Sequence, residues 1–197
     1  MKKFFTFLIL CAVAALTAGC ASSRISQFYT LSPSAISPAT QKAGYGLSVG
    51  PVSIPAVVDR PQIVLQKGPN QVYISEFDRW AAPLTQEIAR IMAENLAGKL
   101  GVSQVTLFPQ MAAEDSSYRV VIDILRFDST LNHSAILDAR WTVTSPEGNK
   151  TQNGRVKITE TVQGGGMADL VAAHSLALEK LSQTIAQGIQ TIESGSH

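Results

Sequence analysis

The side chains best suited to chemistry are three histidines, and none lies in a recognisable catalytic arrangement. His197 is the last residue, His133 falls in a turn predicted over residues 130–134, and His174 falls on the apolar stripe of a predicted helix. A catalytic site needs a nucleophile, a base and an orienting group within reach of one another. We interpret His174 as a core or groove histidine, with a catalytic role as the less favoured alternative.

The chain also lacks the motifs of common hydrolases, metalloenzymes and nucleotide-binding proteins. It has no Gly-x-Ser-x-Gly elbow and no His-Glu-x-x-His pair, and the run of glycines at 164–166 lacks the Gly-Lys-Ser/Thr ending of a phosphate loop. Glu76 and Asp78 precede a predicted helix, where carboxylates commonly stabilise the helix dipole. We therefore predict no enzymatic activity, no bound metal and no cofactor.

The N-terminus has the three parts of a secretory signal. Lys2 and Lys3 give a positive start, residues 4–16 form an uncharged apolar run, and small residues follow up to Cys20. The apolar run is too short to span a bilayer, which takes about 20 apolar residues. Residues 1–19 are therefore predicted to be a signal peptide.

The residues that end at Cys20, Leu-Thr-Ala-Gly-Cys, resemble the lipobox of bacterial lipoprotein signals. The resemblance implies that the Cys20 thiol receives a diacylglycerol, that the signal is cut before it and that the new amino terminus is acylated. One acyl chain holds a protein weakly, but each buried methylene adds about 0.8 kcal/mol, so three chains form a stable anchor. Ala21 and Ser22 follow, and the enterobacterial sorting rule then implies the outer membrane, with the domain facing the periplasm. The alternative is an ordinary signal peptide with a chance cysteine.

The composition of the predicted mature chain fits one domain without disulfides. Without Lys2 and Lys3 the 16 basic residues fall to 14, against 15 acidic ones, which does not suit a nucleic-acid-binding protein. Cys11 leaves with the signal, so Cys20 is the only remaining cysteine. Its sulfur is occupied by lipid, which excludes a disulfide and a cysteine metal site in the domain.

Hydropathy patterns predict an α+β fold with a mixed, mainly antiparallel sheet and two main helices packed on it. Residues 20–45 are predicted to be the lipidated cysteine and a tether with a possible edge strand, residues 46–193 the domain, and residues 194–197 a tail. Helices are predicted over 83–99 and 167–192. Strands are predicted over 27–31, 47–54, 62–66, 71–75, 105–108, 118–127, 135–144 and 155–162. The last helix is expected to pack on the domain's own sheet rather than form a coiled coil, because His174 and Gly188 interrupt its stripe.

Three segments carry a family resemblance: Phe28–Leu31, Val57–Val64 and Arg79–Leu84. Together they are similar to the ABC-type transport auxiliary lipoprotein family, which includes the PqiC-like lipoproteins. The sequence departs from the usual pattern at Val57-Val58, where an aromatic-leucine pair is commoner, and at Ala82, where Glu is frequent. Trp80 is expected to anchor the strand-to-helix corner in the core.

The resemblance implies a structural component of a lipid-transport machine. Its expected partners are an MCE-domain periplasmic protein and an inner-membrane transporter, and the expected assembly is a homo-oligomeric ring at the outer membrane. The alternative function is a periplasmic hydrolase or a cell-wall-binding lipoprotein. The candidate contact between subunits is a loop between two predicted strands, formed by Val57, Val58, Asp59, Arg60 and Pro61. The alternative is a monomer in which this loop only turns the chain.

Overall fold

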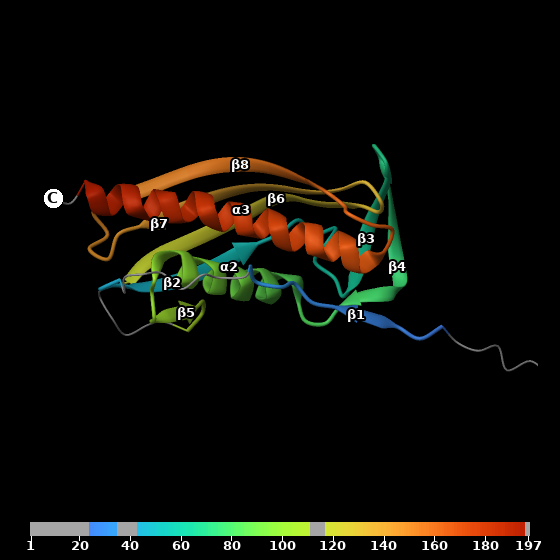
Figure 1. Cartoon of the computed structure of the whole chain (residues 1–197), viewed down its shortest axis with the longest axis horizontal. Coiled ribbons are helices and arrows are strands. Elements are labelled where there is room, and N and C mark those ends of the chain that lie inside the picture. The colour runs from blue at the N-terminus through green and yellow to red at the C-terminus, as the bar shows by residue number, and fades with distance from the viewer. Residues whose placement is uncertain (1–23, 35–42, 111–116, 196–197) are drawn as a thin grey trace, which may run out of the picture.

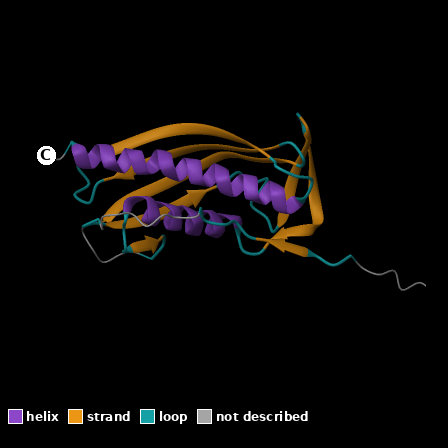
Figure 2. Ribbon diagram, viewed as in Figure 1, coloured by secondary structure: helices purple, strands orange, loops and turns teal. Residues whose placement is uncertain are grey.

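The computed structural model describes residues 24–34, 43–110 and 117–195. The predicted signal peptide, Cys20 and His197 lie outside these ranges. The described chain combines two helices with strands in two sheets, one of five strands and one of three (Figure 1, Figure 2). This confirms the predicted α+β class and the mixed, mainly antiparallel pairing, and it divides the strands between two sheets.

The larger sheet has the strand order β5-β2-β6-β7-β8. β2 (Gly46–Ser53) pairs in parallel with β5 (Val105–Leu107) and β6 (Ser117–Thr130). β6, β7 (Ser134–Thr144) and β8 (Thr151–Thr161) then form an antiparallel meander. The alternation predicted for β7 is confirmed, since its apolar members are all buried: Ala135, Leu137, Ala139, Trp141 and Val143.

The two helices cover one face of the larger sheet (Figure 2). α2 (Leu84–Leu100) contacts β2, and α3 (Met167–Ser194) contacts β7 and β8 as well as α2. Gly101 ends α2 with a φ of 68°, a left-handed conformation that glycine adopts without a steric penalty. Both residues that interrupt the stripe of α3 are buried with it, so the helix packs on its own domain, as predicted.

The smaller sheet has the order β1-β4-β3 and stands across one end of the larger sheet (Figure 1). β1 (Gln27–Tyr29) is an edge strand parallel to β4 (Gln71–Trp80), and β3 (Gln62–Gly68) pairs antiparallel with β4 and packs on β6. β4 runs five residues beyond its predicted end. Glu76 and Asp78 therefore lie in a strand, and the prediction that they stabilise a helix N-terminus is wrong.

The chain enters and leaves the domain at opposite ends of its long axis. β1 and the residues before it lie at the end formed by the smaller sheet, while α3 ends at the far side (Figure 1). No helix among the described residues has the length and apolar character needed to cross a bilayer. The N-terminal chain therefore enters the domain beside the smaller sheet, far from the C-terminal end of α3.

Candidate functional site

The three segments that carry the family resemblance meet at this end of the domain. Residues 27–29 of β1 pair with residues 78–80 of β4, and Gln62 at the start of β3 pairs with Arg79 from the other side. Two further backbone bonds close the arrangement: the Trp80 N–H donates to the Pro61 carbonyl at 2.7 Å, and the Ala81 N–H donates to the Tyr29 carbonyl at 2.8 Å. We call this three-segment arrangement the junction.

Trp80 links the junction to the rest of the core. Its side chain is buried, and its ring meets Phe127 of β6 edge-on at a centroid distance of 6.2 Å. Phe127 in turn stacks on His174 of α3 at 3.9 Å. One row of rings therefore joins the smaller sheet, the larger sheet and a helix, which confirms Trp80 as a core anchor.

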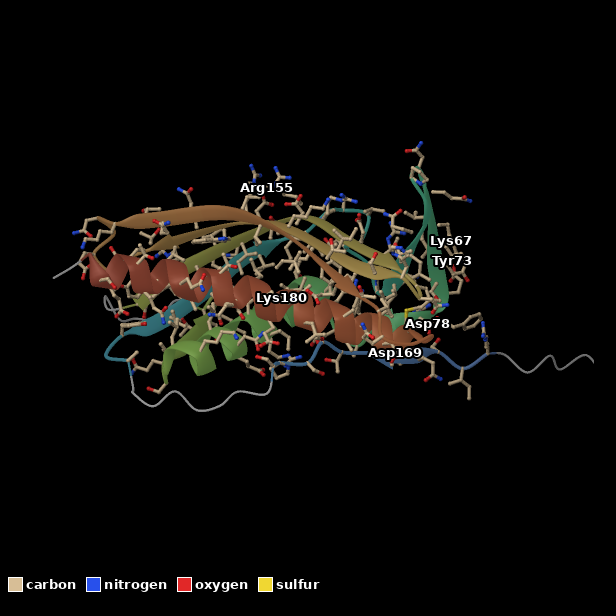
Figure 3. The ribbon with its side chains drawn as sticks, turned by 45° about the horizontal axis from the view of Figure 1, so that its top comes forward. Lys67, Tyr73, Asp78, Arg155, Asp169 and Lys180 are labelled. Atoms are coloured by element: carbon tan, nitrogen blue, oxygen red, sulfur yellow. The ribbon has the colours of Figure 1, made fainter. Side chains whose placement is uncertain are left out.

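A half-buried polar cluster holds β1 against β4. The Tyr29 hydroxyl donates to Asp78 at 3.0 Å, and Ser75 donates to the other carboxylate oxygen of Asp78 at 2.6 Å. Burial, the hydrogen bond to Asp78 and the charge of Asp78 all raise the pKa of the Tyr29 hydroxyl above its ordinary value. Figure 3 shows Asp78 at the base of β4, where the N-terminal strand passes it.

A second cluster fixes the residues that follow β1 to α2. Glu87 accepts hydrogen bonds from the Thr30 hydroxyl at 2.5 Å and the Leu31 N–H at 3.1 Å, and Arg90 pairs with Glu87 while donating to the Leu31 carbonyl. Burial alone would raise the pKa of Glu87, but its net pKa is lowered. The lowering comes from hydrogen bonds with Thr30 and Arg90, from the charge of Arg90 and from the Leu31 N–H. The carboxylate therefore stays ionised and serves as the acceptor around which this segment folds.

The docked segment continues to the limit of the described N-terminal range. Leu31 is part of the core, the Ser32 N–H donates to Ser175 of α3, and the Ser34 N–H donates to Asn95 of α2 at 2.9 Å. Residues 27–34 therefore lie against the domain although their composition resembles a tether. Only six residues separate the predicted lipid site at Cys20 from the first strand.

The candidate contact loop lies beside the junction. Val57 is 45% exposed and Asp59 is exposed, whereas Val58 is buried in the core. Arg60 forms no ion pair with Asp59 or Asp78 among the described residues, and its Nε is buried without a hydrogen-bond partner there. Of the two apolar residues in the predicted contact, the loop therefore presents Val57 but not Val58.

Apolar side chains are exposed near the point where the chain enters. Ile25 is 79% exposed, Phe28 65% and Phe77 37%. Beside them lies a groove of about 440 Å³ between the N-terminal segment and α3, with Phe28, Val171 and Leu176 in its lining. The outward face of the larger sheet differs, since it bears cross-strand ion pairs such as Asp138–Arg155, with Arg155 pointing to solvent in Figure 3.

The histidines do not form an accessible catalytic group in the described residues. His174 Nε2 lies 2.8 Å from the Ser129 hydroxyl, but both residues are almost fully buried, and no carboxylate of the described chain bonds to Nδ1. Burial lowers the pKa of His174 to about 3, so the ring is neutral at physiological pH. His133 is exposed and contacts the Ser134 hydroxyl at 2.9 Å, again without a carboxylate partner. No group of metal-ligating side chains is present among the described residues.

Comparison with known proteins identifies the family. A model of the ABC-type transport auxiliary lipoprotein component matches residues 29–186. The chain belongs to this family. The match begins at Tyr29 in β1 and so includes the docked segment and the whole junction apart from its first two residues. Comparison with curated proteins finds no match.

Solved structures show the same fold at low sequence identity. Protein XCC0632 from Xanthomonas campestris is 15% identical, with a TM-score of 0.70 over 87% of this chain and 100% of that one. An uncharacterized protein is 18% identical, with a TM-score of 0.68 over 84% of this chain and 99% of that one. At these identities the likeness concerns the fold alone. Family membership supports a transport-associated, non-catalytic role for a lipoprotein of the cell envelope.

Sequence reasoning alone missed the polar clusters of the junction. The acceptors Glu87 and Asn95 lie 56 and 61 residues after their partners Leu31 and Ser34. On α2 they stand on the side that the helix buries, where a carboxylate and an amide need a partner. That position was the available signal, because a buried Glu or Asn on an apolar helix face implies a donor from elsewhere in the chain.

Proposed function

We propose that this protein is a lipid-anchored periplasmic subunit of an envelope-spanning MCE/ABC-type transport system. It would sit at the outer membrane and help to move lipids or other hydrophobic molecules, with a structural rather than a catalytic role. The family match supports the transport association, and the Leu-Thr-Ala-Gly-Cys sequence ending at Cys20 supports the anchor. The partners would be an MCE-domain periplasmic protein and components of an inner-membrane transporter.

The junction is the observation that carries this proposal. It builds the chain next to the predicted lipid site into the core through β1, Glu87 and Asn95. With six residues between them, the Cα atoms of Cys20 and Gln27 lie at most roughly 25 Å apart. A domain held this close to its anchor suits a fixed collar at a membrane better than a catalyst that must diffuse to its substrate.

A ring of several copies completes the proposal. A domain of this size cannot enclose a passage wide enough for a lipid, and cyclic symmetry is the usual way for identical subunits to form a collar. The contact loop Val57–Pro61 is the proposed head-to-tail contact. Val57, Asp59 and Pro61 are exposed and Arg60 is half-buried, so this loop is open to contact by a neighbouring subunit.

The anchor and the partners are tested together in membranes. Cells that express the protein are labelled with radioactive palmitate and crosslinked, and the protein is then purified. We expect label on the parent protein, no label on Cys20→Ala, and co-purification of an MCE-domain protein with the parent. Label retained on Cys20→Ala would contradict the anchor, and a labelled protein without any transport component would contradict the proposed machine.

The ring is tested by the mass of the lipidated protein in detergent. Light scattering should give several copies for the parent, and Arg60→Glu should lower that mass while the fold is retained. Arg119→Glu is the matched control, because Arg119 is exposed on β6 away from the loop. A monomer at high concentration, alone and with the MCE partner, would contradict a ring, and an unchanged ring in Arg60→Glu would exclude this loop.

A further inference from the structure

We propose that the face formed by Arg24, Ile25, Phe28, Phe77 and Arg79 rests on the phospholipid surface of the anchoring membrane. We call these five residues the entry face. The inference rests on the proposed lipid anchor at Cys20 and adds an orientation to it. The domain would be held with its smaller sheet against the bilayer and the C-terminal end of α3 directed away from it.

The strand register places Phe28 and Arg79 on one side of the smaller sheet. Phe28 is the parallel partner of Arg79, and the next pair along the two strands is Tyr29 with Trp80. Successive residues of a strand point to opposite faces, so Phe28 and Arg79 project away from the core while Tyr29 and Trp80 point toward it. Phe77 lies in an irregular part of β4 and joins this face through Arg24. The Arg24 guanidinium lies 5.8 Å from the Phe77 ring centroid, which extends this face toward the N-terminus.

The exposure of these side chains is costly in water and is unexplained by the fold. Ile25 is 79% exposed and Phe28 65%, and Phe77 is still 37% exposed although Arg24 lies over its ring. Aromatic rings with neighbouring cations are typical of the interface between a bilayer and water. Arginine stems can lie along apolar surface while the guanidinium reaches lipid phosphates. Asp78, the nearby acid, is occupied on the opposite face by Tyr29 and Ser75, which leaves Glu76 as the exposed carboxylate of this part of β4.

The length of chain before the entry face selects the membrane as its occupant. Acyl chains on Cys20 would hold its sulfur at the level of the lipid headgroups, and five residues later Ile25 is within roughly 18 Å of it. Phe28 is within roughly 28 Å by the same limit. A lipid surface is therefore always within reach of this face, whereas a protein partner would have to arrive by diffusion.

The test places a fluorescent reporter on the entry face of the full-length lipidated protein. Phe28→Trp is reconstituted into phosphatidylethanolamine and phosphatidylglycerol vesicles with or without brominated acyl chains, which quench tryptophan on contact. Phe108→Trp is the matched control, because Phe108 is 58% exposed and follows β5 toward the other end of the domain (Figure 1). The parent protein gives the background from Trp80 and Trp141, which are both buried.

We expect bromine to quench the added tryptophan of Phe28→Trp at least twofold more than that of Phe108→Trp. Ile25→Trp should behave like Phe28→Trp, and it keeps the test valid if β1 does not tolerate the larger ring, because Ile25 lies outside every strand. Equal quenching at both ends would overturn the orientation. Blue-shifted emission at residue 28 without quenching would also overturn it and would indicate a protein occupant, such as a second copy.

Mass spectrometry of the same preparation separates failure of the inference from failure of the anchor. Acylated Cys20 together with no quenching at residues 25 and 28 contradicts the entry face and leaves the lipoprotein proposal standing. An unacylated Cys20 contradicts the proposed anchor, and with it the inference that depends on it. Acylation with strong quenching supports both.

Discussion

The junction and the body formed by the larger sheet and its helices are stabilised in different ways. In the body, side chains that recur at the period of a helix or a strand fill the space between α3 and β7. In the junction, three segments distant in sequence meet, and buried polar groups such as Glu87 and Asn95 join them. The comparison indicates that the body determines whether the chain folds, while the junction determines how the N-terminal chain is held.

The two regions also place their charges differently. In the Asp123–Arg140 pair on the outer face of the larger sheet both side chains are exposed, and an exposed pair adds little stability. Glu87 is 8% exposed and accepts hydrogen bonds from the Thr30 hydroxyl and the Leu31 N–H as well as from Arg90. A buried acceptor that loses its donors costs far more than an exposed one. Substitutions in the junction should therefore act on a few specific contacts, and those in the body on packing.

The largest expected effect comes from the tryptophan that connects the two regions. Trp80→Ala should lower the free energy of unfolding by about 3–5 kcal/mol, because it removes a buried ring and leaves a cavity. It should also loosen β1, since Trp80 is the partner of Tyr29 and the end of the row through Phe127. Denaturant unfolding and hydrogen exchange at residues 29–31 would measure the two effects.

Trp141→Ala is the control for this prediction. Trp141 is 6% exposed, against 5% for Trp80, but it lies in β7 against α3. A similar loss of stability is expected, but residues 29–31 should stay protected from hydrogen exchange relative to the rest of the chain. Equal loosening of that segment in both variants would show that the junction has no separate role.

Acid should destabilise the body through His174. Burial holds the pKa of His174 near 3, against 6.5 for a free histidine, so between these values the unfolded chain binds a proton that the folded one does not. Stability is therefore complete above about pH 6.5 and falls by roughly 1 kcal/mol for each pH unit below it. His174→Gln should flatten this slope between pH 5 and 6.5, where carboxylates are still largely ionised. An unchanged slope would mean that the imidazole is not sealed from solvent.

A smaller effect is expected where Gly188 of α3 lies against Trp141 of β7. In a helix interior alanine is favoured over glycine by up to about 1 kcal/mol, so Gly188→Ala would stabilise an isolated helix. In the folded protein the new Cβ would lie 2.6 Å from the Trp141 ring, and we expect a net loss of about 1–3 kcal/mol. In the background of Trp141→Phe the same substitution should cost less. A gain of stability in the parent background would show that the helix can move away from the sheet.

The body could be predicted from the sequence because its signals are local. The period of the apolar residues places α3 over 167–192 and β7 over 135–144, against observed bounds of Met167–Ser194 and Ser134–Thr144. His174 was also correctly assigned to the buried stripe. The second half of β4 was missed because Ser75, Glu76 and Asp78 break the alternation there. Two of these polar residues serve the junction, where Asp78 accepts hydrogen bonds from both Ser75 and Tyr29.

The junction was predictable only in part. Resemblance selected its three segments, but nothing local showed that they meet, because the contacts join residues about 50 to 60 positions apart. The Ser-rich and Pro-rich composition after Leu31 is typical of a tether, since such residues bury little apolar surface. The structure shows that hydrogen bonds to Glu87, Asn95 and Ser175 replace that missing apolar burial.

The smallest effect should come from Glu87, and a neighbouring acid provides a matched control for it. Arg90 pairs with both Glu87 and Glu94, but only Glu87 also accepts from Thr30 and Leu31. Glu87→Gln should therefore cost on the order of 1.5 kcal/mol and increase hydrogen exchange at residues 30–34. Glu94→Gln removes an exposed i,i+4 pair and should cost less than about 0.5 kcal/mol without affecting that segment.

The same carboxylate makes the segment sensitive to acid. Because the folded-state pKa of Glu87 is lowered, its contribution to stability is complete above about pH 4.5 and is lost as the pH falls through the folded-state value. The parent protein should thus expose residues 30–34 in acid, and Glu87→Gln should expose them at neutral pH. If hydrogen exchange at residues 30–34 is unchanged in Glu87→Gln, β1 and Leu31 alone hold the N-terminal chain.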